Sequence, residues 1–189
     1  MNVYNKENNK TIKMELDLIV ENLYYDKIEL INKEDKDKKP IVSVVSRDQR
    51  DLVKIFKAFY LKYPHLKWIT FRDMRGLPRE VFAKELSESC VAVWVDDVAG
   101  FGTFPIEAMK SGVPVIAKVP NMVPEYFTDK NGLWSHDLRT IPDLIANYVQ
   151  AWLEDGEPSE LYEEMSKLNN SHSVEDMKQK ISELINESE

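Results

Sequence analysis

Residues 90–117 read CVAVWVDDVAGFGTFPIEAMKSGVPVIA and contain, in order, a strand, a loop, a helix and a second strand. The apolar runs at 90–95 and 114–117 are typical of strands buried on both faces, and residues 104–110 are expected to form the helix. Ser111 and Gly112 end that helix. Such a unit predicts two parallel strands joined by a right-handed crossover.

The same alternation extends outward from this unit. Apolar runs at 41–45 and 66–71 predict two further strands. Helices are expected from Asp48, as the N-cap, to the stop at Pro64, and then at about 78–87, 141–153, 158–168 and 173–185. Short strands alternating with helices predict an α/β fold, a doubly wound, Rossmann-like parallel sheet with extra C-terminal helices.

The first 39 residues differ from the rest of the chain. They end in the charge run KEDKDKK at 33–39, which is typical of a solvated linker or loop. A short helix at 13–23 and a short strand at 27–31 are expected before it. We therefore predict an N-terminal attachment segment, residues 1–39, and one domain, residues 40–189.

Composition excludes several classes of protein. The 25 Lys and Arg against 33 Asp and Glu give a formal charge of −8, which argues against nucleic acid as a partner. No run approaches the roughly 20 apolar residues of a transmembrane helix, and the first 13 residues are too polar for a signal peptide, so we expect a cytoplasmic protein. Cys90, the one cysteine, excludes an internal disulfide and is expected to be an inert core thiol.

The loop after the strand at 90–95 is the strongest candidate site, because open parallel sheets bind ligands at the carboxyl ends of their strands. The free backbone amides of Gly102, Thr103 and Phe104 begin a helix and favour an anion such as a phosphate. A tight turn that needs glycine only for its backbone angles is the alternative.

Three charged side chains accompany this loop. Arg47 and Arg50 follow the strand at 41–45, where a bound phosphate would explain two cations near a helix N-terminus. The alternative is two solvated arginines beside Asp48 and Asp51. Glu107, one turn into its helix, is suited to accept hydrogen bonds from sugar hydroxyls, or is simply a favourable charge near the helix start.

Three segments resemble the retaining GT-B glycosyltransferases of the group 1 family. GFGTFPIEAMKSGVPVIA at 100–117 is similar to the family signature E-G-F-G-x-x-x-x-E-A-M-A-x-G-x-P-V-I-A. NMVPEYFTDKNGLW at 121–134 resembles the segment that follows, and SRDQRDLVKIFKAFYLKYPHLKW at 46–68 resembles the earlier G-R-x-x-x-x-K-G segment. The likeness spans about residues 40–134.

The resemblance implies the donor-binding, C-terminal half of an enzyme that transfers a hexosyl group from a nucleotide sugar to a glycan or polysaccharide. Arg47 and Arg50 would bind the diphosphate, the loop 100–104 (Gly100, Phe101, Gly102, Thr103, Phe104) the phosphate and donor sugar, and Glu107 the ribose. No cofactor and no obligatory metal are implied. Met74 and Arg75, after the strand at 66–71, are candidates to line the base pocket, with an ordinary loop as the alternative.

Departures from the family pattern leave a second reading open. The family's first Glu falls at Ala99, and Ser46 replaces the glycine before its Arg. A complete enzyme of this type is about twice as long, so we expect an N-terminal acceptor domain to be missing, the isolated domain to be inactive, and the full enzyme to lie at the inner face of the membrane. The alternative is a non-catalytic interaction or regulatory module. A third reading, a Mg²⁺-dependent phosphoacceptor, depends on Asp96 and Asp97.

Overall fold

The computed structural model describes residues 38–96, 102–121, 123–124, 126–156, 159–171 and 183. The chain divides into two units, Met1–Glu29 with Asn170–Glu189 and Leu30–Asn169, and the sheet lies in the second. The elements expected at 13–23, at 27–31 and, apart from residue 183, at 173–185 lie outside the described residues. The predicted domain boundary after residue 39 stays a prediction.

Five parallel strands form one sheet in the order β2-β1-β3-β4-β5. The strands are β1 (Lys39–Ser46), β2 (Thr70–Asp73), β3 (Ser89–Val95), β4 (Val115–Lys118) and β5 (Leu133–Ser135). The chain moves outward from β1 to β2 and then returns to place β3 on the other side of β1. This reversal makes the carboxyl ends of β1 and β3 the topological switch point, where ligands bind in such sheets.

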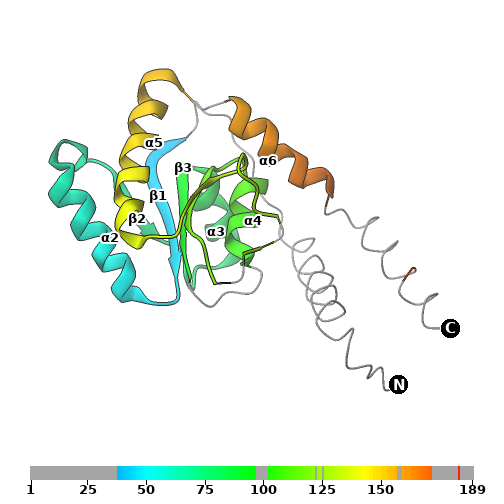
Figure 1. The fold of residues 1–189 in the computed structure, drawn as a ribbon, viewed down its shortest axis with the longest axis horizontal. Coiled ribbons are helices and arrows are strands. Elements are labelled where there is room, and N and C mark those ends of the chain that lie inside the picture. Colours follow the sequence, from blue (N-terminus) through cyan, green and yellow to red (C-terminus); the bar gives the residue numbers. More distant parts are fainter. Residues whose placement is uncertain are drawn as a thin grey trace, which may run out of the picture. The chain divides into compact units, whose positions relative to one another are not determined.

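Helices cover both faces of the sheet, as the doubly wound prediction requires. They are α2 (Gln49–Lys62), α3 (Arg79–Ser87), α4 (Thr103–Lys110), α5 (Ile141–Asp155) and α6 (Ser159–Ser171), with short 3₁₀ turns η2 (Pro64–Leu66) and η3 (Leu138–Thr140). Figure 1 shows α2 and α5 on one side of the strands and α3 and α4 on the other. The α/β prediction is therefore confirmed.

Apolar side chains of β1 and β3 form the centre of the core. All seven residues of β3 are buried, which explains its unbroken apolar run. Leu52, Ile55 and Phe59, at helical spacing, carry the buried face of α2. Asp48 caps α2 as predicted, because its side chain accepts a hydrogen bond from the backbone N–H of Arg50 at 2.8 Å.

Two strand predictions differ from the structure. The run at 66–71 was expected to be one strand, but Pro64 begins a 3₁₀ turn through Leu66, and β2 starts only at Thr70. No strand was expected at 133–135, yet β5 pairs there with β4. All three of its residues are half-buried, so this edge strand lacks the apolar run that marked the central ones.

The end of the charge run is part of the fold, so the prediction of a solvated linker or loop is wrong for Lys38, which is buried, and for Lys39, which belongs to a strand although its side chain is exposed. Lys39 begins β1 and pairs with Glu88. Lys38 is 7% exposed, and its Nζ donates to the carbonyl of Gly112 at 3.1 Å, at the end of α4. A cation is favourable at a helix C-terminus. The hydroxyl of Tyr162, on α6, donates to the same carbonyl at 3.0 Å.

A polar contact joins α2 to α5 at the surface. The carboxylate of Asp143 accepts from Lys62 Nζ at 2.6 Å and from the hydroxyl of Tyr63 at 2.6 Å. These hydrogen bonds, first that of Lys62 and then that of Tyr63, lower the pKa of Asp143. The contact links α2 to α5, the two helices that cover one face of the sheet.

Cys90 is fully buried, which confirms the core position predicted for it, and it is not part of a disulfide. Its Sγ lies 3.3 Å from the carbonyl oxygen of Ile41 on the neighbouring strand. Among the helices of the described residues, none combines the length and the apolar character needed to cross a membrane.

Candidate functional site

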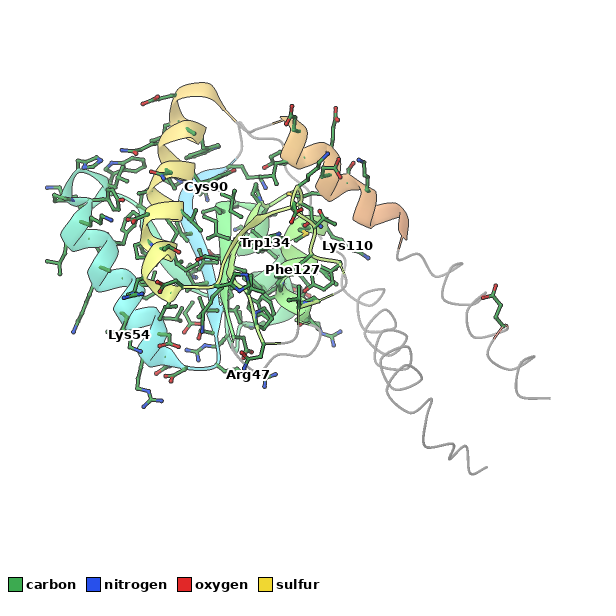
Figure 2. All side chains as sticks on the ribbon, viewed as in Figure 1. Arg47, Lys54, Cys90, Lys110, Phe127 and Trp134 are labelled. Carbon is green, nitrogen blue, oxygen red and sulfur yellow. The ribbon has the colours of Figure 1, made fainter. Side chains whose placement is uncertain are left out.

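Arg47 and Asp96 meet at the switch point of the sheet. Arg47 follows the last residue of β1, and Asp96 follows the last residue of β3. In Figure 2 Arg47 lies at the carboxyl end of the strands, opposite Cys90 near their amino end. Nε of Arg47 is 2.9 Å from Oδ2 of Asp96, although the side chains are 71% and 8% exposed, respectively. A buried carboxylate therefore pairs with an exposed guanidinium.

Arg50 is engaged differently. Its Nε lies 3.0 Å from both carboxylate oxygens of Asp48, and its Nη2 lies 2.7 Å from Oδ2. The hydrogen bond from the Arg50 side chain, followed by that from its backbone, lowers the pKa of Asp48 to about 2. With 85% of its side chain exposed, Arg50 adopts the solvated pairing that the sequence offered as the alternative to phosphate binding. Asp51 pairs with Lys54 instead.

The loop after β2 separates its two candidate residues. Met74 is 2% exposed, and its sulfur accepts a hydrogen bond from the Ser43 hydroxyl at 3.3 Å, so it is a core residue here. Arg75 Nε donates to Asp73 at 2.9 Å, and Nη1 donates to the carbonyl of Ser46 at 2.9 Å. The side-chain hydrogen bond of Arg75 lowers the pKa of Asp73. Arg75 thus ties the end of β2 to the end of β1.

Gly102, the N-cap of α4, has a structural requirement for glycine. Its φ is +75°, in the region that side chains avoid. A Cβ at this position would lie 2.5 Å from the Trp94 ring and 3.2 Å from the Tyr126 hydroxyl. That hydroxyl donates to the Gly102 carbonyl at 2.6 Å. The glycine therefore permits both the turn and a close approach to β3.

The start of α4 presents the other predicted ligands. Thr103 is half-buried, whereas Phe104 is 4% exposed, with its ring 6.2 Å from that of Phe82. Glu107 lies on the second turn and is 6% exposed. Gly100 and Phe101, together with Ala99 and Asp97, lie outside the described residues. The structure thus brings Arg47 and Asp96 together at the same edge of the sheet that carries the start of α4.

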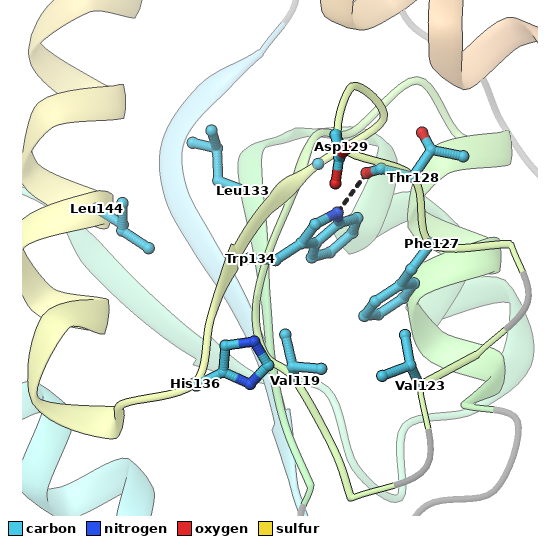
Figure 3. Close-up of a pocket in the computed structure, with 10 residues that line it drawn as sticks. Val119, Val123, Phe127, Thr128, Asp129, Leu133, Trp134, His136 and Leu144 are labelled. Carbon is cyan, nitrogen blue, oxygen red and sulfur yellow. Dashed lines mark hydrogen bonds between the residues drawn. The ribbon is translucent and has the colours of Figure 1, made fainter.

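An aromatic cluster missed by the sequence analysis adjoins Gly102. The rings of Phe127 and Trp134 stack with centroids 3.9 Å apart, and Phe127 meets Trp94 edge-on at 5.9 Å. Trp134 Nε1 donates to the carbonyl of Thr128 at 2.6 Å (Figure 3). No local signal reveals the contact between Tyr126 and Gly102, because 24 residues separate them. The sequence pointed to this segment through the resemblance at 121–134, which gave no role to its rings.

The cluster borders an open hollow of about 490 Å³ beside β4 and β5. Figure 3 shows side chains from three segments around it. They include Val119, Val123, Phe127, Trp134, His136 and Leu144. Of the predicted site residues that the structure describes, none lines this hollow.

Two solved structures show the same fold. One is the pneumococcal O-GlcNAc transferase GtfA in complex with UDP and GlcNAc, at 15% identity and a TM-score of 0.58. The other is the GtfA/B complex, at 14% identity and a TM-score of 0.57. Each match covers 85% of this chain but only 38% of the solved chain. No curated protein sequence matches the chain.

The family model described as "Glycosyl transferases group 1" matches residues 58–172, more than half of the chain. The matched range includes Arg75, Gly102 and Glu107, whereas Arg47 and Arg50 precede it. The parallel sheet, its switch point and this match together identify a Rossmann-like domain of the GT-B type. The chain belongs to the group 1 glycosyltransferases.

Proposed function

We propose that this chain is the donor-binding half of a retaining glycosyltransferase that uses a nucleotide sugar. The observation that carries the proposal is the exposed guanidinium of Arg47 at the β1/β3 switch point. Its neighbours along the same edge are the carboxyl end of β3 and the N-terminus of α4. Both an arginine fork and free helix amides suit the oxygens of a diphosphate.

The proposed reaction divides the work among these groups. The bond between the anomeric carbon and the diphosphate oxygen breaks, the acceptor hydroxyl oxygen forms the new bond to that carbon, and the hydroxyl proton leaves with the nucleoside diphosphate. Arg47 and the amides of Gly102 to Phe104 would stabilise the negative charge on the leaving group. Glu107 would accept hydrogen bonds from the ribose hydroxyls. We propose that a metal is not obligatory, since these groups supply the positive potential.

The burial of Met74 and the pairing of Arg50 with Asp48 make these two residues weaker candidates for ligand binding than Arg75 and Arg47. Arg50 would have to leave Asp48 to reach a diphosphate, whereas Arg47 is already at the switch point. Met74 offers no exposed surface to a base, so among the two candidates in its loop Arg75 is the better one. We therefore place Arg47 ahead of Arg50 as the diphosphate ligand.

The acceptor side is proposed to lie elsewhere. The chain spans 38% of the length of the solved chains it resembles, so an acceptor domain would be contributed by further sequence. We propose a glycan acceptor and a hexosyl donor. The isolated chain is then expected to bind a donor without transferring its sugar.

Calorimetric titration of the whole chain with UDP, GDP and ADP tests the proposal. UDP is the first choice because a protein of the same fold was solved with it. We expect one nucleotide to bind, with affinity reduced at least tenfold in Arg47→Gln and in Glu107→Gln. Arg139→Gln is the matched control, because Arg139 is 90% exposed and pairs with Asp137 beyond the edge strand β5. Equal effects of Arg47→Gln and Arg139→Gln would refute the assignment of Arg47.

A non-catalytic module is the second candidate. Ala99, at the family's first Glu position, and the pairing of Arg50 with Asp48 both favour it. This candidate predicts that none of the three nucleotides binds, so the same titration separates the two functions.

A further inference from the structure

Three arginines lie at the carboxyl ends of β1 and β2, and they differ in how many of their guanidinium nitrogens bind to other residues of the protein. Arg50 uses Nε and Nη2 on Asp48. Arg75 uses Nε and Nη2 on Asp73 and Nη1 on the Ser46 carbonyl. Arg47 makes an ion pair through Nε, and no hydrogen bond joins its terminal nitrogens to the described residues. Arg47 alone of the three keeps both terminal nitrogens available.

The partner of Arg47 is the most buried carboxylate of these pairs. Asp96 is 8% exposed, against 40% for Asp48 and 42% for Asp73. Charges interact more strongly where water is excluded, so a contact of 2.9 Å to a buried carboxylate restrains a guanidinium more than a contact at the surface does. A buried carboxylate also requires compensation of its charge. The ion pair therefore opposes movement of Arg47 away from the switch point.

We infer that Asp96 is a positioning residue that holds Arg47 by its Nε and leaves the two terminal nitrogens to bind a diphosphate. The inference rests on the proposed function. Asp96 acts on the ligand only through Arg47, because its own negative charge repels an anion. Asp96 thus has two opposite effects on the affinity for a diphosphate: its charge weakens binding, and its restraint of Arg47 strengthens it. The restraint of Arg47 is the larger effect.

A positioning role for Asp96 can be distinguished from two other roles for a carboxylate at this position, direct binding of a metal or phosphate group and binding of the donor sugar. A metal-binding or phosphate-accepting Asp96 would act directly, independently of Arg47. A sugar-binding Asp96 would affect nucleotide sugars but not inorganic pyrophosphate. A positioning role predicts a loss with pyrophosphate that depends on Arg47.

The test is a double-mutant cycle with Asp96→Asn, Arg47→Gln and the double variant in the whole chain, titrated with inorganic pyrophosphate and with UDP, GDP and ADP. Asparagine keeps the shape of Asp96 and removes its charge. We expect Asp96→Asn to raise the Kd about tenfold while the Tm shifts by only a few degrees. In the Arg47→Gln background the same change leaves the Kd unchanged or lowers it.

Four results would overturn the inference. A lower Kd for Asp96→Asn in the wild-type background means that the carboxylate only competes for Arg47. Equal weakening in both backgrounds means that Asp96 acts independently of Arg47, and a large fall in Tm means a purely structural role. An unchanged Kd in the wild-type background means that Arg47 needs no restraint.

A second measurement needs no ligand. The heteronuclear ¹H–¹⁵N NOE of the Arg47 Nε–H is expected to be that of a restrained group in the wild type and of a mobile group in Asp96→Asn, whereas Arg50 is unchanged. If this holds but no diphosphate binds, the proposed function fails while the restraint by Asp96 stands. If a diphosphate binds and Arg47 is equally mobile in both proteins, the inference fails and the proposed function stands.

Discussion

Replacing Gly102 by alanine is expected to be the most damaging single-methyl change at the candidate site. An alanine at φ +75° costs about 1–2 kcal/mol in backbone strain. Its Cβ would also meet the Trp94 ring at 2.5 and 2.6 Å, which is overpacking of a kind that costs about 1–3 kcal/mol. The two terms together predict that Gly102→Ala lowers the free energy of unfolding by about 2–5 kcal/mol.

Gly76 provides a matched control. Its φ is +71°, close to that of Gly102, but a Cβ there has no atom within 4 Å. Gly76→Ala therefore carries only the backbone term of about 1–2 kcal/mol. Urea unfolding of the whole chain, followed by circular dichroism, measures both variants against the wild type, and the difference between them isolates the clash with Trp94.

A second substitution separates the clash from other causes. Trp94→Leu removes the ring atoms that the new methyl group would meet, so Gly102→Ala is expected to cost less in that background. The reasoning is wrong if Gly102→Ala and Gly76→Ala cost the same, or if Trp94→Leu gives no relief.

Three further predictions concern single contacts. Tyr126→Phe removes the hydrogen bond to the Gly102 carbonyl and should lower the free energy of unfolding by about 1 kcal/mol, with weaker nucleotide binding by calorimetry; unaltered binding would separate this bond from the site. Asp143→Asn should destabilise by no more than about 1 kcal/mol at neutral pH, since this carboxylate is partly exposed. The pKa of Asp143 is lowered in the folded state, so its stabilising effect is present above the unfolded pKa of about 3.9 and is lost as the pH falls through the folded pKa. Urea unfolding should therefore show the stabilities of the wild type and Asp143→Asn converging below about pH 4. A difference that stays constant with pH would contradict this. Lys38→Met should cost about 1–2 kcal/mol by loss of donors at the end of α4, whereas the exposed Lys54→Met should stay within about 0.5 kcal/mol, and equal Tm shifts would disprove the role of burial.

The sequence was sufficient for the parts of the fold that depend on local pattern. Central strands buried on both faces have unbroken apolar runs, so β1, β3 and β4 were predictable to within one or two residues. Asp48 was identifiable as a helix cap because its role depends on the residues directly after it. The edge strand β5 was not predictable, since pairing with β4 on one side stabilises three half-buried residues that carry no pattern.

The candidate site was predictable in position but not in its contacts. The strand-end loops were identified from topology alone, and Arg47 and Asp96 do meet there. The ion pairs of Arg50 and Arg75 each join residues two apart. The sequence left the pairing of Arg50 as one of two alternatives, and it did not indicate the pair of Arg75 with Asp73. The contact of Tyr126 with Gly102 bridges 24 residues and arises only when the segment before β5 folds against β3.

The position of Trp94 against Gly102 also makes the start of α4 optically visible. The chain has four tryptophans, at positions 68, 94, 134 and 152, so changing the other three to phenylalanine leaves one indole beside the N-cap of α4. Indole emission responds to nearby charge and to movement of packed neighbours. An anion that binds at the backbone amides of this turn would then change the fluorescence of Trp94. Stopped-flow fluorescence could therefore measure its association rate without any added label.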